Sequence, residues 1–399
     1  MNHPDEILNR WIANCPVLNE PKFRSKYQLS REIIGEGSFG TVIKGYDIQT
    51  KDVRAIKAIR RSKRTDFMKI ELKLLTNLGG HENIIKFYDF FHYSSSIALV
   101  MESFVHCTVY ELLLKSRSDR YFPLAYFKSL LSALAYLHDN GFIHRDVKLS
   151  NFLYSPETNG FRLVDFGLAT LDNGSMEQTR EEAVKKMKAH QKCIICADQL
   201  SVCTKCSKIP TKKNYSVVGT PGMRSPETLL GIGLKSPPMD IFSSGMCLLS
   251  LLTLRHPFFS PTTETENILN LMTLLGSDRF QKVMLKEGVP IMISKKFKPI
   301  DFYKFILLSR FSASVVQEVF GSLVKKDCKQ CNDRSVTGID SVCFCRSDEE
   351  KFSTDNYCDD LIRLYVDLLY RAIEMDRFER YTAHQLLGVI EVYEKRFNS

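Results

Sequence analysis

The sequence lacks a long uncharged apolar segment and a recognisable signal sequence. No apolar run reaches the roughly 18 residues that a membrane-spanning helix requires. The amino terminus, MNHPDEILNRWIANC, carries acidic residues and has no apolar h-region, so it does not read as a secretory signal. We therefore expect no membrane association and no secretion.

A disulfide framework is also missing, although the chain has 12 cysteines. Disulfides persist in oxidising compartments, and an unsecreted chain of this length instead keeps its thiols reduced or uses them as metal ligands. We expect Cys15, Cys107 and Cys247 to be ordinary buried residues. Of the remaining cysteines, eight fall in the two inserts described below and Cys358 directly follows the second.

The overall charge bias is small but unevenly placed. The net charge is 55 − 46 = +9, and residues 180–213 hold nine Lys or Arg against three Asp or Glu, which is six of the nine excess charges. This basic segment suggests acidic substrates. The apolar content of 44% and charged content of 25% are ordinary for a globular domain, and 399 residues suffice for a core divided into lobes.

Two short motifs near the middle of the chain supply the groups that phosphoryl transfer needs. Residues 144–151 read HRDVKLSN, which fits H-R-D-x-x-x-x-N, and residues 165–167 read DFG. In this pattern the carboxylate of Asp146 accepts a hydroxyl proton. Asn151 and Asp165 can together hold Mg²⁺ against the phosphates. The motifs therefore predict an ATP-dependent and Mg²⁺-dependent enzyme.

A glycine-rich loop lies upstream between two predicted strands. It consists of Gly35, Glu36, Gly37, Ser38, Phe39, Gly40, Thr41 and Val42. Its glycines let backbone N–H groups approach phosphate oxygens without a Cβ in the way. A plain glycine hairpin is the alternative. The strand–turn–strand setting excludes a dinucleotide site, which needs a helix after the third glycine.

The next elements supply a lysine and its partner. Ala55 and Lys57 lie in a predicted strand, and the lysine would face the phosphates. Residues 67–78 have the apolar spacing of a helix that carries Glu71, the natural partner of Lys57. Alone, these residues could equally be an exposed strand lysine and a solvated glutamate, so the assignment depends on the complete set.

The following segments read as strands over 84–91 and 97–100 and as an amphipathic helix over 123–140, which Gly141 ends. Met101, Glu102 and Phe104 mark the join between a small β-rich lobe and a larger helical lobe. Backbone groups at this join could hydrogen-bond an adenine edge, with Met101 at the back of the pocket.

This ordered set of motifs resembles the eukaryotic protein kinase family from residue 28 to about 390. The resemblance implies an α+β bilobal fold, with an extension over 1–27, the N-lobe over 28–104 and the C-lobe over 105–399. Lys148 matches the lysine of serine/threonine kinases, and Thr220 would stabilise the catalytic loop. Glu227 should pair with Arg380. His144 and Phe166 are expected to pack, and the helix that opens at Asp240 is expected to anchor the catalytic loop.

Two inserts interrupt this pattern, at 172–216 and 295–357. The first contains two CxxC pairs, formed by Cys193, Cys196, Cys203 and Cys206. Four thiolates satisfy tetrahedral Zn²⁺, and unliganded thiols or a zinc module for nucleic acid are the alternatives. The second insert carries Cys328, Cys331, Cys343 and Cys345, with Cys358 close by. Its CxC spacing suits chelation less well, so free thiols are an equal alternative.

The sequence also resembles the cell-division-cycle-seven kinases, which fire replication origins. The two inserts and the motifs at residues 144–154, 163–169 and 219–224 carry this resemblance. Leu149 departs from their usual proline. The resemblance implies a nuclear enzyme, an activating regulatory subunit of the DBF-four type, the MCM helicase as substrate and no requirement for direct nucleic-acid binding. A casein-kinase-like or cyclin-dependent-like enzyme is the alternative. A pseudokinase scaffold would be expected to have lost Lys57, Asp146, Asn151 or Asp165.

The cysteine spacing generates a first prediction. Elemental analysis of the purified protein should find at least one zinc per chain, and replacing Cys203 and Cys206 should remove it, because a tetrahedral site cannot persist on two thiolates. Replacing Cys15 is the control and should leave the metal content unchanged. Protein without zinc would reduce the first insert to a loop of free thiols.

Overall fold

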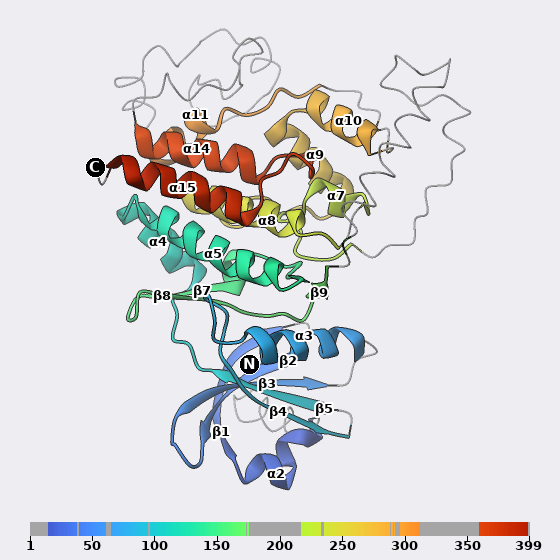
Figure 1. Ribbon diagram of the computed structural model, residues 1–399, viewed down its shortest axis with the longest axis vertical. Helices are drawn as coiled ribbons and strands as arrows, with labels where there is room; N and C mark the ends of the chain where they lie inside the picture. The colour runs from blue at the N-terminus through green and yellow to red at the C-terminus, as the bar shows by residue number, and fades with distance from the viewer. Residues whose placement is uncertain are drawn as a thin grey trace, which may run out of the picture. The chain divides into compact units, whose positions relative to one another are not determined.

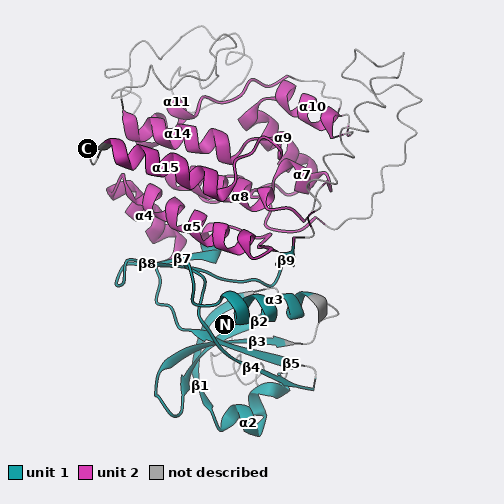
Figure 2. Cartoon of the chain, viewed as in Figure 1, with its two compact units in different colours: residues 1–107, 150–171 teal, residues 108–149, 172–399 magenta. Residues whose placement is uncertain are grey.

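The computed structural model describes residues 15–37, 40–60, 65–94, 96–172, 174, 217–232, 235–287, 289, 291, 296–311 and 359–397 (Figure 1). The chain divides into two compact units, residues 1–107 with 150–171 and residues 108–149 with 172–399 (Figure 2). An antiparallel sheet dominates the first unit and helices dominate the second. The expected α+β fold class is confirmed.

The first unit is built on a five-stranded antiparallel sheet of order β1-β2-β3-β5-β4. Its strands are β1 (Tyr27–Gly37), β2 (Gly40–Asp47), β3 (Val53–Arg60), β4 (Phe87–Tyr93) and β5 (Ser96–Glu102), and α3 (Thr65–Leu78) follows β3. After η2 (Leu149–Asn151), a smaller antiparallel pair follows, formed by β7 (Phe152–Ser155) and β8 (Gly160–Leu163), and then β9 (Thr170–Leu171).

The helix expected over 67–78 is confirmed as α3, but the strand expected over 84–91 is wrong at its start. β4 begins only at Phe87. Glu82 and Asn83 have positive φ, which continues the turn past the end of α3. Ile84 and Ile85 are then both buried, and the Ile85 N–H donates to the Leu163 carbonyl (3.1 Å). Their backbone therefore joins the β8 strand and not the large sheet.

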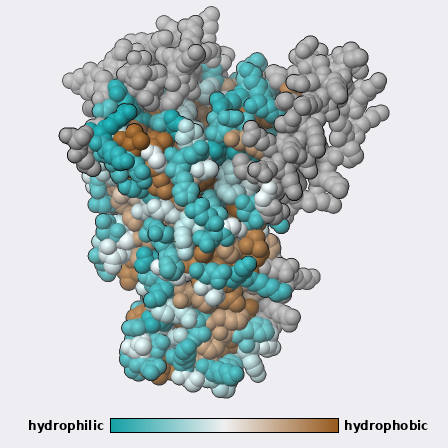
Figure 3. Space-filling model, viewed as in Figure 1, coloured by the Kyte–Doolittle hydropathy of each residue, from teal (hydrophilic) through white to brown (hydrophobic). Residues whose placement is uncertain are grey.

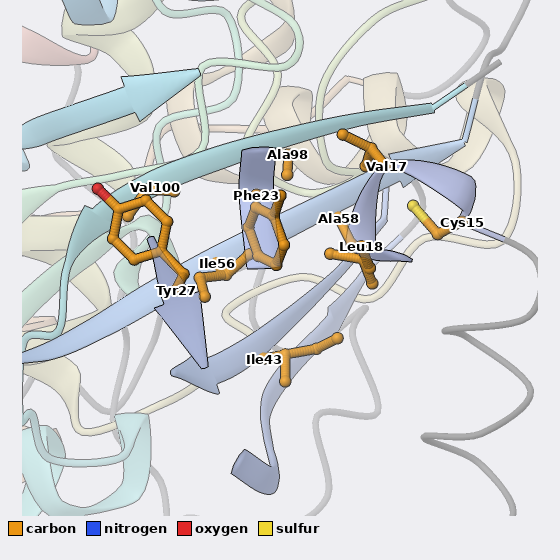
Figure 4. Packing of buried hydrophobic residues seen from close by; sticks show 10 residues of the cluster. All are labelled: Cys15, Val17, Leu18, Phe23, Tyr27, Ile43, Ile56, Ala58, Ala98 and Val100. Carbon is orange, nitrogen blue, oxygen red and sulfur yellow. The ribbon is translucent and has the colours of Figure 1, made fainter. Parts of the chain in front are cut away.

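Residues 15–26 cover one face of the sheet. They form η1 (Pro16–Asn19) and α2 (Pro21–Arg24), and the Val17 N–H donates to Ser96 Oγ (2.8 Å). Figure 4 shows their apolar side chains against alternate strand residues. The buried cluster is Cys15, Val17, Leu18, Phe23, Tyr27, Ile43, Ile56, Ala58, Ala98 and Val100. Because side chains alternate along a strand, Lys57 points away from this covered face.

The second unit packs its helices around α8 (Pro238–Thr253), all of whose residues except Ser243 are buried. Its other elements are α4 (Val109–Ser118), α5 (Phe122–Asp139), β6 (Phe142–Ile143), α7 (Pro226–Leu229), α9 (Glu264–Leu275), α10 (Ser277–Lys286), α11 (Phe302–Arg310), α14 (Asp360–Ala372) and α15 (Ala383–Phe397). Helix α5 confirms the helix expected over 123–140. A Cβ on Gly245 would come within 2.5 Å of Ile373, so glycine allows this close packing.

The structure also bears on the surface of the molecule and on the expected burial of Cys15, Cys107 and Cys247. Within the ranges given above, no helix is long and apolar enough to cross a membrane. The visible face of the molecule mixes hydrophilic and apolar residues (Figure 3). Cys15 and Cys247 are buried as expected, but Cys107 is only partly buried, so that expectation is wrong. Cys107 follows the end of β5 in an irregular segment.

The covered sheet face generates a second prediction. Phe23→Ala should lower the free energy of unfolding by about 3–5 kcal/mol, because Phe23 is fully buried against the sheet and its ring contacts that of Phe91 in β4. Urea denaturation followed by fluorescence and circular dichroism measures the change. Phe311→Ala is the matched control, since Phe311 is 49% exposed and should lose little. Equal effects of the two substitutions would contradict the packing role of residues 15–26.

Candidate active site

A buried lysine with two carboxylate partners forms the centre of the first unit. Lys57 Nζ lies 2.7 Å from Glu71 Oε1 and 2.9 Å from Asp165 Oδ1. Lys57 comes from β3, Glu71 from α3, and Asp165 from the segment after β8. The predicted Lys57–Glu71 pair is therefore present, and Asp165 joins it, which the sequence analysis did not anticipate.

The two carboxylates decide the charge of this lysine. Burial alone would lower the pKa of Lys57, but the charges and hydrogen bonds of Glu71 and Asp165 outweigh burial and raise it. The ammonium is thus fully charged at physiological pH. A fixed and charged ammonium at this point can neutralise phosphate oxygens.

The strand register gathers the other predicted nucleotide residues on the face that carries Lys57. Val42 lies opposite Lys57 in the β2–β3 ladder, and Ala55 lies opposite Met101 in the β3–β5 ladder. Ala55 and Lys57 are two residues apart, so all four share one side of the sheet. This side is opposite to the one that residues 15–26 cover.

The glycine-rich loop joins β1 to β2 above this face. Gly35 and Glu36 lie in β1, and Gly37 pairs with Gly40 across the turn. A Cβ on Gly40 would come within 2.3 Å of the Ala58 carbonyl, so the close approach of β2 and β3 requires glycine there. The predicted residues Ser38 and Phe39 lie outside the described residues.

Asn151 and Asp165 lie together at the open end of the β7–β8 hairpin, just before β7 and just after β8. The Val164 N–H donates to the Asn151 carbonyl (2.9 Å), which closes the hairpin next to both residues. Asn151 is buried, whereas the Asp165 side chain keeps 35% of its surface exposed, at a φ of 63°. An amide oxygen and a carboxylate are hard ligands of the kind Mg²⁺ takes in this chemistry, so the two side chains fit that ion.

The catalytic-loop residues belong to the second unit and form a closed hydrogen-bond triangle. Lys148 Nζ donates to Asp146 Oδ2 (2.8 Å) and to Thr220 Oγ1 (3.0 Å), and Thr220 Oγ1 donates to Asp146 Oδ1 (2.7 Å). All three were predicted from the sequence, and the structure brings them together. The arrangement fixes both oxygens of a carboxylate that can accept a proton.

A second buried carboxylate holds the backbone of this loop. Asp240 accepts hydrogen bonds from the N–H groups of His144 (2.7 Å) and Arg145 (2.8 Å), and His138 Nε2 lies 3.0 Å from it. Arg145 has a φ of 69°, a strained conformation for a non-glycine residue. Burial by itself would raise the pKa of Asp240, but the hydrogen bond and charge of His138, together with His144, hold it below its usual value. The loop is therefore anchored from α8, as expected.

Arg224 fixes the segment that carries Thr220. Its Nε and Nη2 donate to the Gly219 carbonyl at 2.9 and 2.6 Å. Gly219 has a φ of 88°, and a Cβ there would come within 2.7 Å of the Arg145 carbonyl, so only glycine fits. The sequence analysis assigned no role to Arg224 or to His138. Arg224 lies within the GTPGMR motif. No local sequence pattern marks His138 as different from any other helical histidine.

The expected pair of Glu227 and Arg380 is present and buried. Arg380 Nη1 and Nη2 donate to the two carboxylate oxygens at 2.5 and 3.1 Å, and the guanidinium lies over the Phe242 ring. His144 and Phe166 are buried as predicted.

The predicted zinc ligands Cys193, Cys196, Cys203 and Cys206 lie outside the described residues, as do the cysteines of the second insert. Among the residues that the structure does describe, no group of three or more His, Cys, Asp and Glu side chains is placed to hold a metal ion such as Zn²⁺.

Comparisons with known proteins agree with this geometry. A family model described as "Protein kinase domain" matches residues 28–190. A probable cell division control protein 7 homolog 2 of Encephalitozoon cuniculi is 29% identical over 254 residues, 63% of this chain and 71% of the relative. The cell cycle serine/threonine-protein kinase hsk1 of Schizosaccharomyces pombe is 27% identical over 333 residues, 81% and 64% respectively. A non-specific serine/threonine protein kinase of Drosophila melanogaster is 24% identical over 450 residues, 89% and 66% respectively.

The buried carboxylate of Asp240 generates a third prediction. Asp240→Asn should destabilise the protein by about 1–3 kcal/mol at pH 7, because an amide places an NH₂ group against one of two backbone donors. A group with a lowered pKa stabilises the fold above its unfolded pKa and loses this contribution as the pH falls through its folded pKa. The difference between the two proteins should therefore shrink below about pH 4.

Denaturant unfolding across this pH range measures the effect. Asp139→Asn is the matched control, because Asp139 also pairs with a histidine, His384, but both side chains are more than half exposed. A pH-independent difference between wild type and Asp240→Asn would show that the charge of Asp240 has no stabilising role.

Proposed function

The chain contains a serine/threonine protein kinase domain similar to the cell division control protein 7 homologues, and from this premise we propose that it is the catalytic subunit of the kinase that triggers DNA replication. The resemblance that the motifs indicated is thereby confirmed at the level of the kinase type. The more specific steps, phosphorylation of the MCM helicase in the nucleus and activation by a DBF-four-type subunit, are proposals that rest on that resemblance.

One observation carries the catalytic assignment. Lys57 is 7% exposed and is held between the carboxylates of Glu71 and Asp165. Burying the Lys57 ammonium is costly unless it is paired, and its pairing with buried Glu71 and partly exposed Asp165 matches a phosphate-binding lysine beside a metal ligand. A pseudokinase scaffold is disfavoured because Lys57, Asp146, Asn151 and Asp165 are all retained.

The roles of the remaining residues follow from their chemistry. Membership of the kinase family implies ATP and Mg²⁺, and Asn151 and Asp165 would hold the ion, which neutralises charge on the transferred phosphoryl group. Asp146 would orient the substrate hydroxyl and accept its proton. Lys148, fixed between Asp146 and Thr220, would stand beside the γ-phosphate. The backbone of residues 101–104 would hydrogen-bond the adenine.

The inserts belong to the same proposal. We infer that the paired cysteines of residues 172–216 bind a structural Zn²⁺, and that both inserts serve subunit docking. Support for the zinc comes from the CxxC spacing alone, and support for docking comes from the resemblance.

The proposed function generates a fourth prediction. The chain co-expressed with a DBF-four-type regulatory subunit should phosphorylate Ser and Thr of purified MCM subunits, and the isolated chain should be far less active. Asp165→Asn should reduce the rate by at least about 100-fold, because it removes the carboxylate that would hold Mg²⁺, the ion that neutralises the developing negative charge. Phosphate incorporation from labelled ATP measures the rate.

Asp52→Asn is the matched control, since the Asp52 side chain is 57% exposed and lies in the same unit. Full activity of the isolated chain, or a failure to phosphorylate MCM subunits while a general Ser/Thr substrate is phosphorylated, would contradict the replication assignment. Retained turnover in Asp165→Asn would remove the proposed metal role.

A further inference from the structure

An ion pair outside the catalytic motifs joins the end of β5 to β8. Arg162 Nε donates to Glu102 Oε2 (2.8 Å) and Arg162 Nη2 donates to Glu102 Oε1 (3.1 Å), so the pair is a two-pronged fork. Fork geometry fixes both the distance and the orientation of the two groups, which a single lysine contact does not. The side chains are 30% and 22% exposed.

Each partner of the fork is also held by its own surroundings. Glu102 Oε2 accepts a second hydrogen bond from the Lys86 N–H (3.3 Å), and the Glu102 N–H donates to the Lys86 carbonyl (2.9 Å). Arg162 Nη1 donates to the Phe161 carbonyl (2.8 Å), and the guanidinium lies over the Phe104 ring, 5.1 Å from its centroid. All three guanidinium nitrogens are thus engaged. These contacts restrict the Arg162–Glu102 pair to a single geometry.

The fork connects two segments that handle different parts of a nucleotide. Glu102 belongs to the adenine segment, residues 101–104. Arg162 belongs to the metal hairpin, residues 151–165, which carries both Asn151 and Asp165 at its open end. A backbone hydrogen bond from the Cys107 N–H, three residues past the adenine segment, to the Tyr154 carbonyl (3.0 Å) also contacts the metal hairpin.

Each segment has its own support apart from the fork. The adenine segment continues β5, which pairs with β3 and β4, and the metal hairpin is closed by the β7–β8 ladder. Loss of the fork should therefore leave both segments folded but loosen the spacing between them, which would then depend on backbone hydrogen bonds such as that from Ile85 to Leu163. A nucleotide that spans both segments would feel this loss, whereas a ligand that reaches only one would not.

We propose that Arg162 and Glu102 are positioning residues that set the distance between the adenine segment and the metal hairpin. In doing so they couple adenine binding to Mg²⁺ binding in the kinase reaction. This inference rests on the proposed function, because it requires that residues 101–104 and the two metal ligands bind MgATP. It adds a pair that belongs to neither the catalytic loop nor the glycine-rich loop.

The alternative is a surface ion pair of no functional consequence, which is common for partly exposed charges. The two explanations differ in what they predict for coupling. A merely structural pair would alter the binding of adenosine, ADP and MgADP by the same factor. A positioning pair would reduce the gain in ADP affinity that Mg²⁺ provides and leave adenosine binding nearly unchanged.

The test is calorimetric titration of the full chain with adenosine, with ADP, and with ADP plus Mg²⁺. In R162Q the adenosine affinity should change by less than about twofold, and the Mg²⁺-dependent gain in ADP affinity should fall by at least about fivefold. R162K should show a partial loss, because it keeps the charge but not the fork. E102Q should match R162Q, and the double variant should lose little more, as expected for two residues acting as one unit.

R371Q is the matched control, because the Arg371–Asp367 pair has nearly the same exposure, 33% and 22%, but lies within α14. The thermal midpoints of all variants should lie within a few degrees of wild type. The inference would be overturned if Mg²⁺ increased the ADP affinity of R162Q as much as that of wild type, or if R371Q lost as much of this increase as R162Q. The proposed function would stand in either case as long as the wild type binds MgADP. Failure of the wild type to bind MgADP would instead overturn the proposed function, and the inference with it.

Discussion

The Lys57 ammonium and its two carboxylate partners are the constraint on which the first unit depends. Burying one positive charge is unfavourable, and it becomes acceptable here because Glu71 from α3 and Asp165 from the segment after β8 both contact it. Three parts of the chain that are distant in sequence must therefore be placed correctly for any one of them to be stable. Their convergence fixes the charge at the point where phosphate oxygens would be bound.

The two faces of the large sheet have different roles: one packs in the hydrophobic core, and the other holds the predicted nucleotide-binding residues. Side chains of one parity, including Ile56 and Ala58, are buried against residues 15–26, while those of the other parity include Ala55 and Lys57, which are predicted to contact the nucleotide. This division follows from the two-residue period of a strand. The covered face also means that residues 15–26 contribute to the core of the unit that holds Lys57.

In the second unit, buried charged side chains hold segments of the backbone in place. Asp240 holds the N–H groups of His144 and Arg145 where the loop is strained, and the Glu227–Arg380 pair ties α7 to the segment before α15. A backbone bent into an unfavourable conformation persists only where its surroundings determine it from several sides. Asp146, Lys148 and Thr220 are held in one arrangement as a result.

The sequence alone was sufficient for the ordered motifs, the α+β class, the helices α3 and α5, and the pairs Lys57–Glu71 and Glu227–Arg380. The motifs and the Lys57–Glu71 pair followed from residues that carry chemistry at a characteristic spacing, and the two helices followed from a helical period. The α+β class and the Glu227–Arg380 pair followed from the resemblance to the kinase family. The tertiary structure alone decided the second partner of Lys57, the hydrogen bonds of His138 and Arg224, the start of β4 and the fork of Arg162 with Glu102. Such contacts join residues up to 108 positions apart. A local sequence pattern does not determine which distant residues will lie beside it in the folded chain.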